Sequence, residues 1–352
     1  MNTCDVLISG TGIAGLTLAL HLIENQPELK IILLSKSDPE LTNTSLAQGG
    51  IASVCNRITD SFEAHIQDTL KAGQGKCKQE VVEMVIKQAP QRLNELINWG
   101  AHFNTATNGE LDLALEGGHS QNRVVHYKDK TGRHIQTVLW TKIQAEKNIE
   151  VISNAFCVDI ITDDTTEEKQ AIGMTYMLGE HPEEKQIFAK SIVLATGGSG
   201  QLFAFTSNPE IATGDGIAMA FRAGATITDM QYIQFHPTAL YEKGKSNLFL
   251  ISEAVRGFGG HLINAKGKRF VFEYDIRGEL ATRDIVSKAI TNEINQSPDE
   301  FVYLDVRHID QDAFKNHFPT IYERFIDVGF HPETDLIPIV PVAHYQCGGI
   351  EV

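Results

Sequence analysis

The sequence has no long hydrophobic run, and this absence excludes a class of protein. The most apolar stretch, residues 6–23, contains three glycines and a histidine, and one strand followed by one helix accounts for it. We therefore expect no membrane-spanning segment. The stretch also has no basic region before it and no small-residue cleavage site after it, which argues against a secretory signal.

The sequence has no excess of positive charge. Lysine and arginine number 30 against 45 acidic residues, so the formal net charge is −15. Nucleic acids and anionic membranes are bound by clustered cations, and we expect neither as the main partner. Local arginines can still hold a small anionic substrate.

The sequence also has few cysteines. The five are an odd number, widely spaced and without a CxxC pair. We interpret them as free thiols in a reducing cytoplasm, so we expect a cytoplasmic protein with no bound metal. The length of 352 residues and the 42% hydrophobic content are typical of about two globular domains.

A dinucleotide-binding fingerprint stands at the start of the chain. A short apolar strand runs into Gly10-x-Gly12-x-x-Gly15, and a helical pattern follows. Gly10 allows a tight turn, Gly12 lets a pyrophosphate approach the backbone, and Gly15 lets the helix pack on the strand. The alternative is a glycine-rich turn without a ligand. The fingerprint alone does not distinguish NAD, NADP and FAD.

The second strand departs from the usual NAD pattern. Residues 30–35 are predicted to form a strand with a continuous apolar run inside it. The strand ends in Ser35-Lys36, where an NAD-binding unit usually has Asp or Glu. Lys36 suits a phosphate or an adenosine edge, or else it is simply solvated. Asp215, which opens a later helix, either caps that helix or faces a sugar hydroxyl.

Several polar clusters stand out from apolar surroundings. A small, glycine-rich stretch at residues 42–52 is either a packed loop against a flat ligand or a flexible linker. Histidines and arginines recur at residues 234–238, 252–257, 282–284 and 342–349. Guanidinium binds carboxylate bidentately and imidazole adds a donor, so the combination suits a dicarboxylate. Each residue taken alone is more often structural.

These clusters belong to a recognisable pattern that covers the chain from residue 4 to residue 352. The sequence resembles the flavoproteins of the succinate dehydrogenase and fumarate reductase superfamily, and within it the L-aspartate oxidases. The resemblance rests on GTGIAGL (10–16), LSK (34–36), NTSLAQGGIA (43–52), EGGHS (116–120), ATGG (195–198), GDG (214–216), QFHPTALY (234–241), SEAVRG (252–257), ATRD (281–284) and HYQCGG (344–349).

The resemblance implies an α/β fold. We expect a doubly wound, Rossmann-like FAD-binding domain at residues 1–237 and an inserted α+β capping domain at residues 238–343. Residues 344–352 would begin the return to the first domain. The family continues well past Val352, so we expect a chain truncated at its C-terminal end, with a flavin pocket open on one side.

The resemblance also assigns site residues by position. Asn43 stands where the respiratory relatives attach FAD covalently through histidine, so FAD should be bound non-covalently. The expected FAD contacts are Gly10, Thr11, Gly12, Ile13, Ala14, Gly15, Lys36, Asn43, Thr44, Ser45, Leu46, Ala47, Gln48, Gly49, Gly50 and Asp215. The expected catalytic or substrate residues are Glu116, His236, Ser252, Arg283 and His344.

The roles implied for these residues suit an amino acid substrate. Glu116 replaces an apolar residue of the respiratory relatives, and its carboxylate can meet an ammonium group. His236 and His344 would hold the carboxylates. Arg283 takes the place assigned to proton transfer, although arginine almost never deprotonates, so its electrostatic role can matter more.

The implied activity is FAD-dependent oxidation of L-aspartate to iminosuccinate, the first step of de novo NAD biosynthesis. The electron acceptor would be O2 or fumarate, and quinolinate synthase would be a partner. Two alternatives remain. One is a fumarate reductase or succinate dehydrogenase-like enzyme, against which Asn43 and Glu116 count. The other is an inactive fragment that folds and binds a nucleotide at most.

Overall fold

The chain packs as two compact units in a computed structural model, which describes residues 2–163, 165, 169–179 and 183–352. Unit 1 consists of Met1–Leu46, Ile135–Gln234 and His344–Val352, and unit 2 consists of Ala47–His134 and Phe235–Ala343. Packing therefore joins residues 47–134 to the later segment. The predicted division into an FAD-binding domain at residues 1–237 and a capping domain at residues 238–343 stays a prediction.

Unit 1 is built on a mixed sheet whose strands lie in the order β6-β2-β1-β9-β8-β7. The first four strands run parallel, and the last three form an antiparallel meander. All four residues of β2 are buried, as expected for a strand covered on both faces. The strands are β1 (Asn2–Ser9), β2 (Ile31–Leu34), β6 (Ile149–Ile152), β7 (Ala155–Asp163), β8 (Gln170–Leu178) and β9 (Lys185–Leu194).

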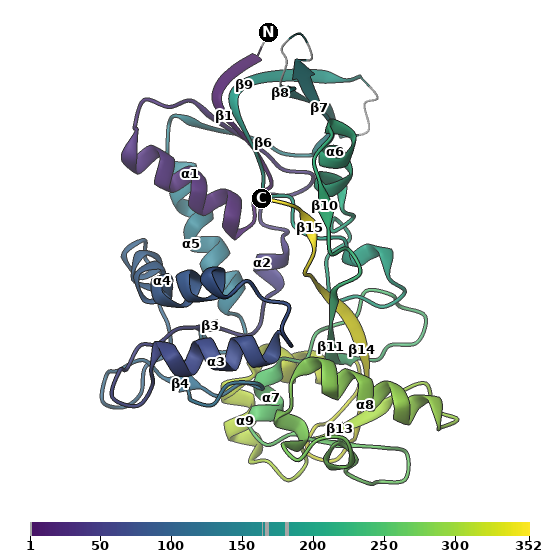
Figure 1. Ribbon diagram of the computed structural model, residues 1–352. Helices are drawn as coiled ribbons and strands as arrows, with labels where there is room; N and C mark the ends of the chain where they lie inside the picture. Colours follow the sequence, from purple (N-terminus) through teal and green to yellow (C-terminus); the bar gives the residue numbers. More distant parts are fainter. Residues whose placement is uncertain (1, 164, 166–168, 180–182) are drawn as a thin grey trace. The chain divides into compact units, whose positions relative to one another are not determined.

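The two faces of the parallel strands of unit 1 are covered differently. Figure 1 shows α1 and α5 on one side of β1. Leu7 and Ile32 share a core with Cys157 and Met174 of the meander, and α6 packs against β7. In α1, Leu16, Ala19, Leu20 and Ile23 are buried, at the steps of three and four that one helix face requires. The elements are α1 (Ile13–Asn25), α2 (Asn43–Leu46), α5 (Thr131–Ala145), α6 (Asp215–Ala223), the short 3₁₀-helix η1 (Gly200–Leu202), and the paired strands β10 (Ile227–Thr228) and β15 (Gly349–Ile350).

The first segment of unit 2 contains a small antiparallel sheet in the order β3-β5-β4, together with two helices. Its strands have two residues each, and the pairing of β4 with β5 closes a long hairpin loop at residues 115–123. The elements are β3 (Ile51–Ala52), α3 (Phe62–Ala72), α4 (Gln79–Asn98), β4 (Leu113–Ala114) and β5 (Val124–Val125).

The second segment of unit 2 contains a sheet in the order β11-β14-β13-β12, with its own apolar core. Phe270, Phe314 and Phe325 are among its fully buried side chains. The strands are β11 (Ile233–Leu240), β12 (His261–Ile263), β13 (Val302–Asp305) and β14 (Ile337–Gln346); the helices are α7 (Glu253–Gly257), η2 (Val271–Glu273), η3 (Gly278–Leu280), α8 (Arg283–Asn295), α9 (Gln311–His317) and α10 (Pro319–Asp327).

The fold class predicted from the sequence is confirmed. A mixed sheet with four parallel strands and flanking helices forms unit 1, and an α+β arrangement follows in unit 2. One helix boundary differs from the sequence-based expectation. The apolar spacing at residues 279–294 predicts a single helix, whereas the structure has η3 followed by α8, with a break at Ala281-Thr282. Within the described residues, no helix has the length and apolar character needed to cross a bilayer.

The core of unit 2 makes a stability prediction. Phe314→Ala removes a fully buried ring, and we expect it to lower the free energy of unfolding by about 3–5 kcal/mol through lost transfer energy and a residual cavity. Phe221→Ala is the matched control, because its side chain is 69% exposed, and it should change stability by no more than about 0.5 kcal/mol. Urea unfolding followed by circular dichroism measures both, and equal effects would contradict the assigned core.

Candidate active site

Two strand-to-helix turns meet at the carboxyl ends of β1 and β9 in unit 1. Gly10 has a φ of 115°, and a Cβ there would lie 2.1 Å from the carbonyl oxygen of Ala195. Only glycine fits this position, because the left-handed φ and the close backbone both exclude a side chain. Gly12 is the N-cap of α1 and provides no side-chain cap. The positive end of the helix dipole therefore lies at this turn.

The predicted loop at residues 43–46 lies at the same helix end. It folds as α2, and the Ile13 N–H donates to the Thr44 Oγ1 at 3.0 Å. Asn43 lies near Gly197, since a Cβ at Gly197 would be 3.7 Å from its Nδ2. The Ser45 hydroxyl donates to the carbonyl of Thr42. Four of the residues predicted to contact FAD in this region have exposed side chains: Ile13, Ala14, Asn43 and Leu46.

Lys36 and Asp215 form an ion pair. The Lys36 Nζ donates to the Asp215 Oδ2 at 2.6 Å and also to Thr213. The Thr213 hydroxyl donates to the other Asp215 oxygen at 2.8 Å. Asp215 does not cap α6, whose N-cap is Gly214 without a side-chain bond, so the capping alternative is wrong. A simply solvated Lys36 is excluded by the same contacts.

Thr11 ties the first turn to the end of β2. Its hydroxyl donates to the Pro39 carbonyl at 3.0 Å and lies 3.1 Å from the Ser35 hydroxyl. Gln136 of α5 donates to the Thr11 carbonyl at 2.8 Å. Thr11 is buried, so its side chain stabilises the turn.

The second half of the predicted glycine-rich stretch, residues 47–50, belongs to unit 2. The Ala47 carbonyl accepts from the Gly132 N–H at 2.9 Å. The Gln48 side chain is buried, and its Oε1 has no hydrogen-bond partner. Gly50 packs against the Val125 backbone of β5. These residues form a packed loop, so the flexible-linker alternative is wrong.

Charged side chains converge in unit 2 around Glu253, which is only 4% exposed. The Arg283 Nε donates to the Glu253 Oε2 at 2.5 Å, and the Arg256 NH2 lies 3.1 Å from the Glu253 Oε1. Burial alone would raise the pKa of Glu253, but Arg256 and Arg283 outweigh it and hold this pKa below its usual value. Glu253 is therefore a buried carboxylate that stays ionised.

Glu116 lies beside this cluster and beside the Ala47–Gly50 loop. A Cβ at Gly49 would be 3.2 Å from the Glu116 Oε1, and a Cβ at Gly117 would be 2.2 Å from the Glu253 Oε1. Burial, together with the negative charge of Glu253, raises the pKa of Glu116 to about 7 against the opposing charge of Arg283. Glu116 can therefore change its protonation state at neutral pH.

His236 and Ser252 have defined hydrogen-bond roles in unit 2. The buried His236 accepts a hydrogen bond at Nδ1 from the Thr238 N–H at 3.2 Å. Because a backbone N–H only donates, the neutral ring carries its proton on Nε2. The Ser252 hydroxyl accepts from the Ala254 N–H at 3.3 Å and caps α7. The catalytic role of Ser252 stays a prediction, and its observed role is to begin this short helix.

His344 belongs to unit 1. Its Nδ1 lies 2.7 Å from the Ser207 hydroxyl, and its carbonyl accepts from the Asn208 Nδ2 at 2.8 Å. Of the predicted FAD contacts, those at residues 10–46 and Asp215 lie in unit 1, together with His344. The predicted contacts at residues 47–50 lie in unit 2, together with Glu116, His236, Ser252 and Arg283. Each set is arranged by its own unit.

Two members of the charged cluster are absent from the residues assigned to the site by sequence. Glu253 and Arg256 lie within the SEAVRG motif, but an ion pair at i and i+3 on a helix is usually structural. The signal that could identify them is their burial, which a sequence pattern does not give. The charged cluster beside Glu116 thus includes two charged residues, Glu253 and Arg256, that the sequence did not assign to the site.

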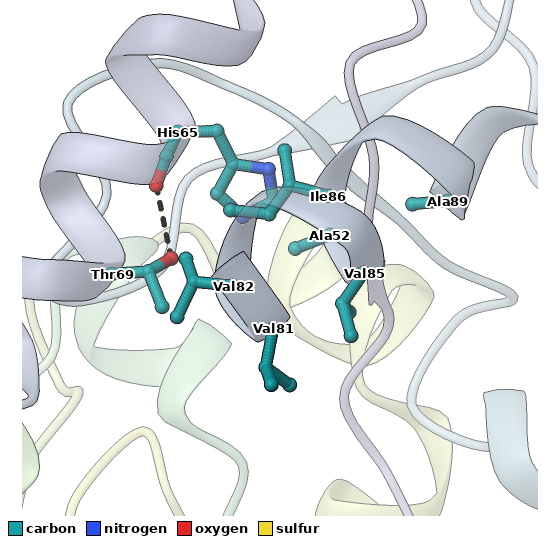
Figure 2. Close-up of a pocket in the computed structure, with 8 residues that line it drawn as sticks. All are labelled: Ala52, His65, Thr69, Val81, Val82, Val85, Ile86 and Ala89. Carbon is teal, nitrogen blue, oxygen red and sulfur yellow. Dashed lines mark hydrogen bonds between the residues drawn. The ribbon is translucent and has the colours of Figure 1, made fainter. Parts of the chain in front are cut away.

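An apolar cavity of about 310 Å³ lies elsewhere in unit 2. Figure 2 shows side chains of α3 and α4 around it, with the His65 ring beside Ile86. None of the predicted site residues lines it; the lining residues are Ala52, His65, Thr69, Val81, Val82, Val85, Ile86 and Ala89.

Comparison with known families and proteins gives consistent results. The FAD binding domain family matches residues 5–352. The L-aspartate oxidase of Yersinia pestis is 43% identical over 99% of this chain and 66% of its own length. The L-aspartate oxidase of Acinetobacter baylyi is 42% identical over 99% of this chain and 64% of its own length. The chain thus spans slightly less than two thirds of these curated relatives.

Solved structures agree with this result. A mutant of the quinol fumarate reductase of E. coli superposes with a TM-score of 0.92 at 33% identity, over 100% of this chain and 62% of that one. Identity above 30% over the whole chain supports common ancestry as well as a shared fold.

The charged cluster predicts how Glu116 titrates. With Glu253 ionised next to it, Glu116 should titrate near pH 7. Glu253→Gln removes the neighbouring negative charge and leaves both arginines uncompensated, so the pKa of Glu116 should fall towards its ordinary value. Carbon-13 NMR titration of labelled glutamate side chains measures this change. The control, Glu83→Gln on α4, should leave the Glu116 titration unchanged; a Glu116 pKa unaffected by Glu253→Gln would contradict the cluster.

Proposed function

The chain belongs to the FAD binding domain family, and we propose that the protein to which it belongs oxidises L-aspartate to iminosuccinate. The predicted relationship to L-aspartate oxidases and fumarate reductases is confirmed by the similarity to both groups. Because the chain spans less than two thirds of those relatives, the activity, the substrate and the partners are our proposal.

The observation that carries this proposal is the position of the Glu116 carboxylate. It lies against the Ala47–Gly50 loop and within a cluster that also contains Arg283. An amino acid with two carboxylates carries one positive and two negative groups, so it matches a site with both an acidic and a basic side chain. Succinate has no ammonium, and it would leave Glu116 without a counter-charge.

The residues present fit FAD. In unit 1, α1 begins without a side-chain cap from Gly12, so its N-terminus can receive a pyrophosphate. Lys36 places a cation at the end of β2, and Asp215 can accept from ribose hydroxyls. Taken by itself, unit 2 has a buried Gln48 Oε1 without a hydrogen-bond donor, so this predicted FAD contact can still accept a hydrogen bond from a ligand. The bound cofactor supplies the two-electron acceptor for the hydride that leaves the substrate Cα.

The proton chemistry falls to Glu116. The substrate ammonium must lose a proton before its nitrogen lone pair can assist the departure of hydride from Cα. The Glu116 carboxylate accepts this proton and becomes a carboxylic acid. Its pKa of about 7 lies near the operating pH, so it can both accept and release the proton. Loss of one further proton from the iminium gives the neutral imine group of iminosuccinate, whose two carboxylates stay ionised.

The remaining residues bind and orient the substrate. Arg283 is held by Glu253 and presents a fixed positive charge to one carboxylate. His236 offers its Nε2–H as a donor, because Nδ1 is occupied by the Thr238 N–H. In unit 1, His344 remains our proposed second carboxylate ligand, and its Nδ1 lies 2.7 Å from the Ser207 hydroxyl. We assign Ser252 a supporting role through the start of α7, next to Glu253.

The cellular setting is also part of the proposal. We propose a cytoplasmic protein, with fumarate or O2 as the electron acceptor. Iminosuccinate is unstable in water, so an enzyme that consumes it at once, quinolinate synthase, is the proposed partner.

Anaerobic titration of the flavin-loaded protein tests the activity. Adding L-aspartate should bleach the flavin absorbance, whereas succinate should not. Bleaching by succinate in place of aspartate would support a fumarate reductase-like enzyme. A chain that stays colourless after incubation with FAD would contradict flavin binding and leave a protein that binds a nucleotide at most.

Substitution of Glu116 tests the basis of selectivity. Glu116→Ala should reduce the preference for L-aspartate over succinate by about tenfold or more, because a hydrogen-bonded partner of the ammonium is lost. Glu110→Ala, at an exposed position of the same chain segment, is the control and should retain the preference. Equilibrium titration of both ligands gives the ratio, and an unchanged ratio in Glu116→Ala would refute the role of Glu116.

Acid precipitation tests the mode of flavin attachment. The respiratory relatives use histidine where this chain has Asn43, whose amide is not a nucleophile towards flavin. All the FAD should therefore remain in the supernatant after the protein is precipitated. Flavin fluorescence in the washed pellet would show a covalent bond and contradict the prediction.

A further inference from the structure

The loop that carries Glu116 is fixed at both ends. Pairing of β4 with β5 joins Ala114 to Val124, and the Arg123 N–H donates to the Ala114 carbonyl at 3.3 Å. Residues 115–123 form the hairpin loop between these strands. Two short strands cannot by themselves fix the middle of a long loop, because loop residues keep their conformational freedom. Other contacts must hold Glu116 in place.

Arg123 is the largest fully buried side chain of the described residues. Its Nε and NH2 donate to the two carboxylate oxygens of Asp60, both at 2.8 Å. Its NH1 donates to the Asp68 Oδ2 at 2.6 Å. Asp68 lies on α3 and Asp60 directly precedes Ser61, the N-cap of this helix, so the guanidinium is held by charge-assisted hydrogen bonds beside α3.

The same centre holds the middle of the loop. The Asp68 Oδ2 also accepts from the N–H and the hydroxyl of Ser120, each at 2.8 Å. The Arg123 NH1 lies 3.1 Å from the His119 Nδ1. A guanidinium has no acceptor, so the His119 Nδ1 accepts and its ring proton is on Nε2. Burial and the charge of Arg123 lower the pKa of His119, which agrees with a neutral ring.

His119 links Arg123 to the backbone of Glu116. The His119 N–H donates to the Glu116 carbonyl at 3.2 Å, which closes a four-residue turn. Gly118 has a φ of 86° in this turn, the conformation that a type II turn requires at its third position. Glu116 is thus joined through two hydrogen bonds to the fully buried Arg123 side chain.

We propose that Arg123 is a positioning residue that, with Asp60 and Asp68, holds the turn at residues 116–119 so that the Glu116 carboxylate faces the substrate ammonium. The proposal rests on the proposed function and extends it to residues outside the substrate site. Glu116 sets the preference for an amino acid, and Arg123 fixes where Glu116 can be.

The arrangement needs arginine and not merely a positive charge. Arg123 makes four polar contacts in fixed directions with Asp60, Asp68 and His119. A lysine ammonium has three donors at the end of a flexible stem, so Arg123→Lys keeps the charge and loses the geometry. Asp68→Asn is the milder variant, because it retains an oxygen acceptor and leaves the Asp60 pair intact.

Hydrogen exchange on the purified full chain tests the loop without reference to activity. Asp68→Asn should raise the exchange of backbone amides in residues 115–123 by about tenfold, because the Ser120 N–H loses its charged acceptor. Asp305→Asn is the matched control: Asp305 and Asp68 are each 17% exposed and each pairs with an arginine. The control should leave this exchange unchanged.

Ligand titration tests the consequence for substrate. Arg123→Lys and Asp68→Asn should weaken L-aspartate binding several-fold and leave succinate binding unchanged, whereas a merely structural loss would weaken both. Combining Asp68→Asn with Glu116→Gln should cost no more aspartate affinity than Glu116→Gln alone, because both changes act through one contact.

The outcomes separate this inference from the proposed function. Unchanged exchange in Asp68→Asn, or additive losses in the double variant, would overturn the positioning role while aspartate still binds to the unmodified chain. Equal weakening of aspartate and succinate would also overturn it. An unmodified chain that binds neither ligand in the presence of FAD would overturn the proposed function itself, and with it the role of Arg123 towards the ammonium.

Discussion

A buried carboxylate keeps its charge only when cations lie against it, and the polar centre of unit 2 depends on this constraint. Glu253 is held between Arg256 and Arg283, and it fixes the direction of the Arg283 guanidinium. Its negative charge also raises the pKa of Glu116. The same carboxylate requires Gly117, because any side chain there would collide with it. Removing Glu253 would therefore change the orientation of Arg283, the pKa of Glu116 and the packing of the loop at Gly117.

A second buried charge performs a similar task at a distance from the first. Arg123 is paired with Asp60 and Asp68, as Glu253 is paired with two arginines. Both clusters adjoin the turn that contains Glu116: Glu253 lies against Gly117, and Arg123 contacts His119. Such pairs add little net stability, but breaking one is costly, so they favour a single loop conformation. We regard that conformation as the basis of substrate preference.

The glycine-rich turn of unit 1 was largely predictable. The Gly10-x-Gly12-x-x-Gly15 spacing identifies a strand, a turn and a helix, because backbone conformation and close approach restrict those positions locally. Lys36 and Asp215 were both named from the sequence, but their ion pair joins residues far apart in the chain. The sequence did not reveal that Glu253 and Arg256 belong to the charged cluster, since burial decides this. The role of Ser252 as a helix cap depends on where α7 begins.

The sequence by itself determined the α/β class, the cofactor family and the identity of most polar groups, because strand and helix periodicity and glycine spacing are local properties. Tertiary structure decided which of these groups act together. The protonation state of Glu116, the tautomers of His119 and His236 and the clamp around Arg123 depend on neighbours brought close by packing. Hydrogen-bond partners and desolvation arise only when distant segments meet, and no linear pattern records them.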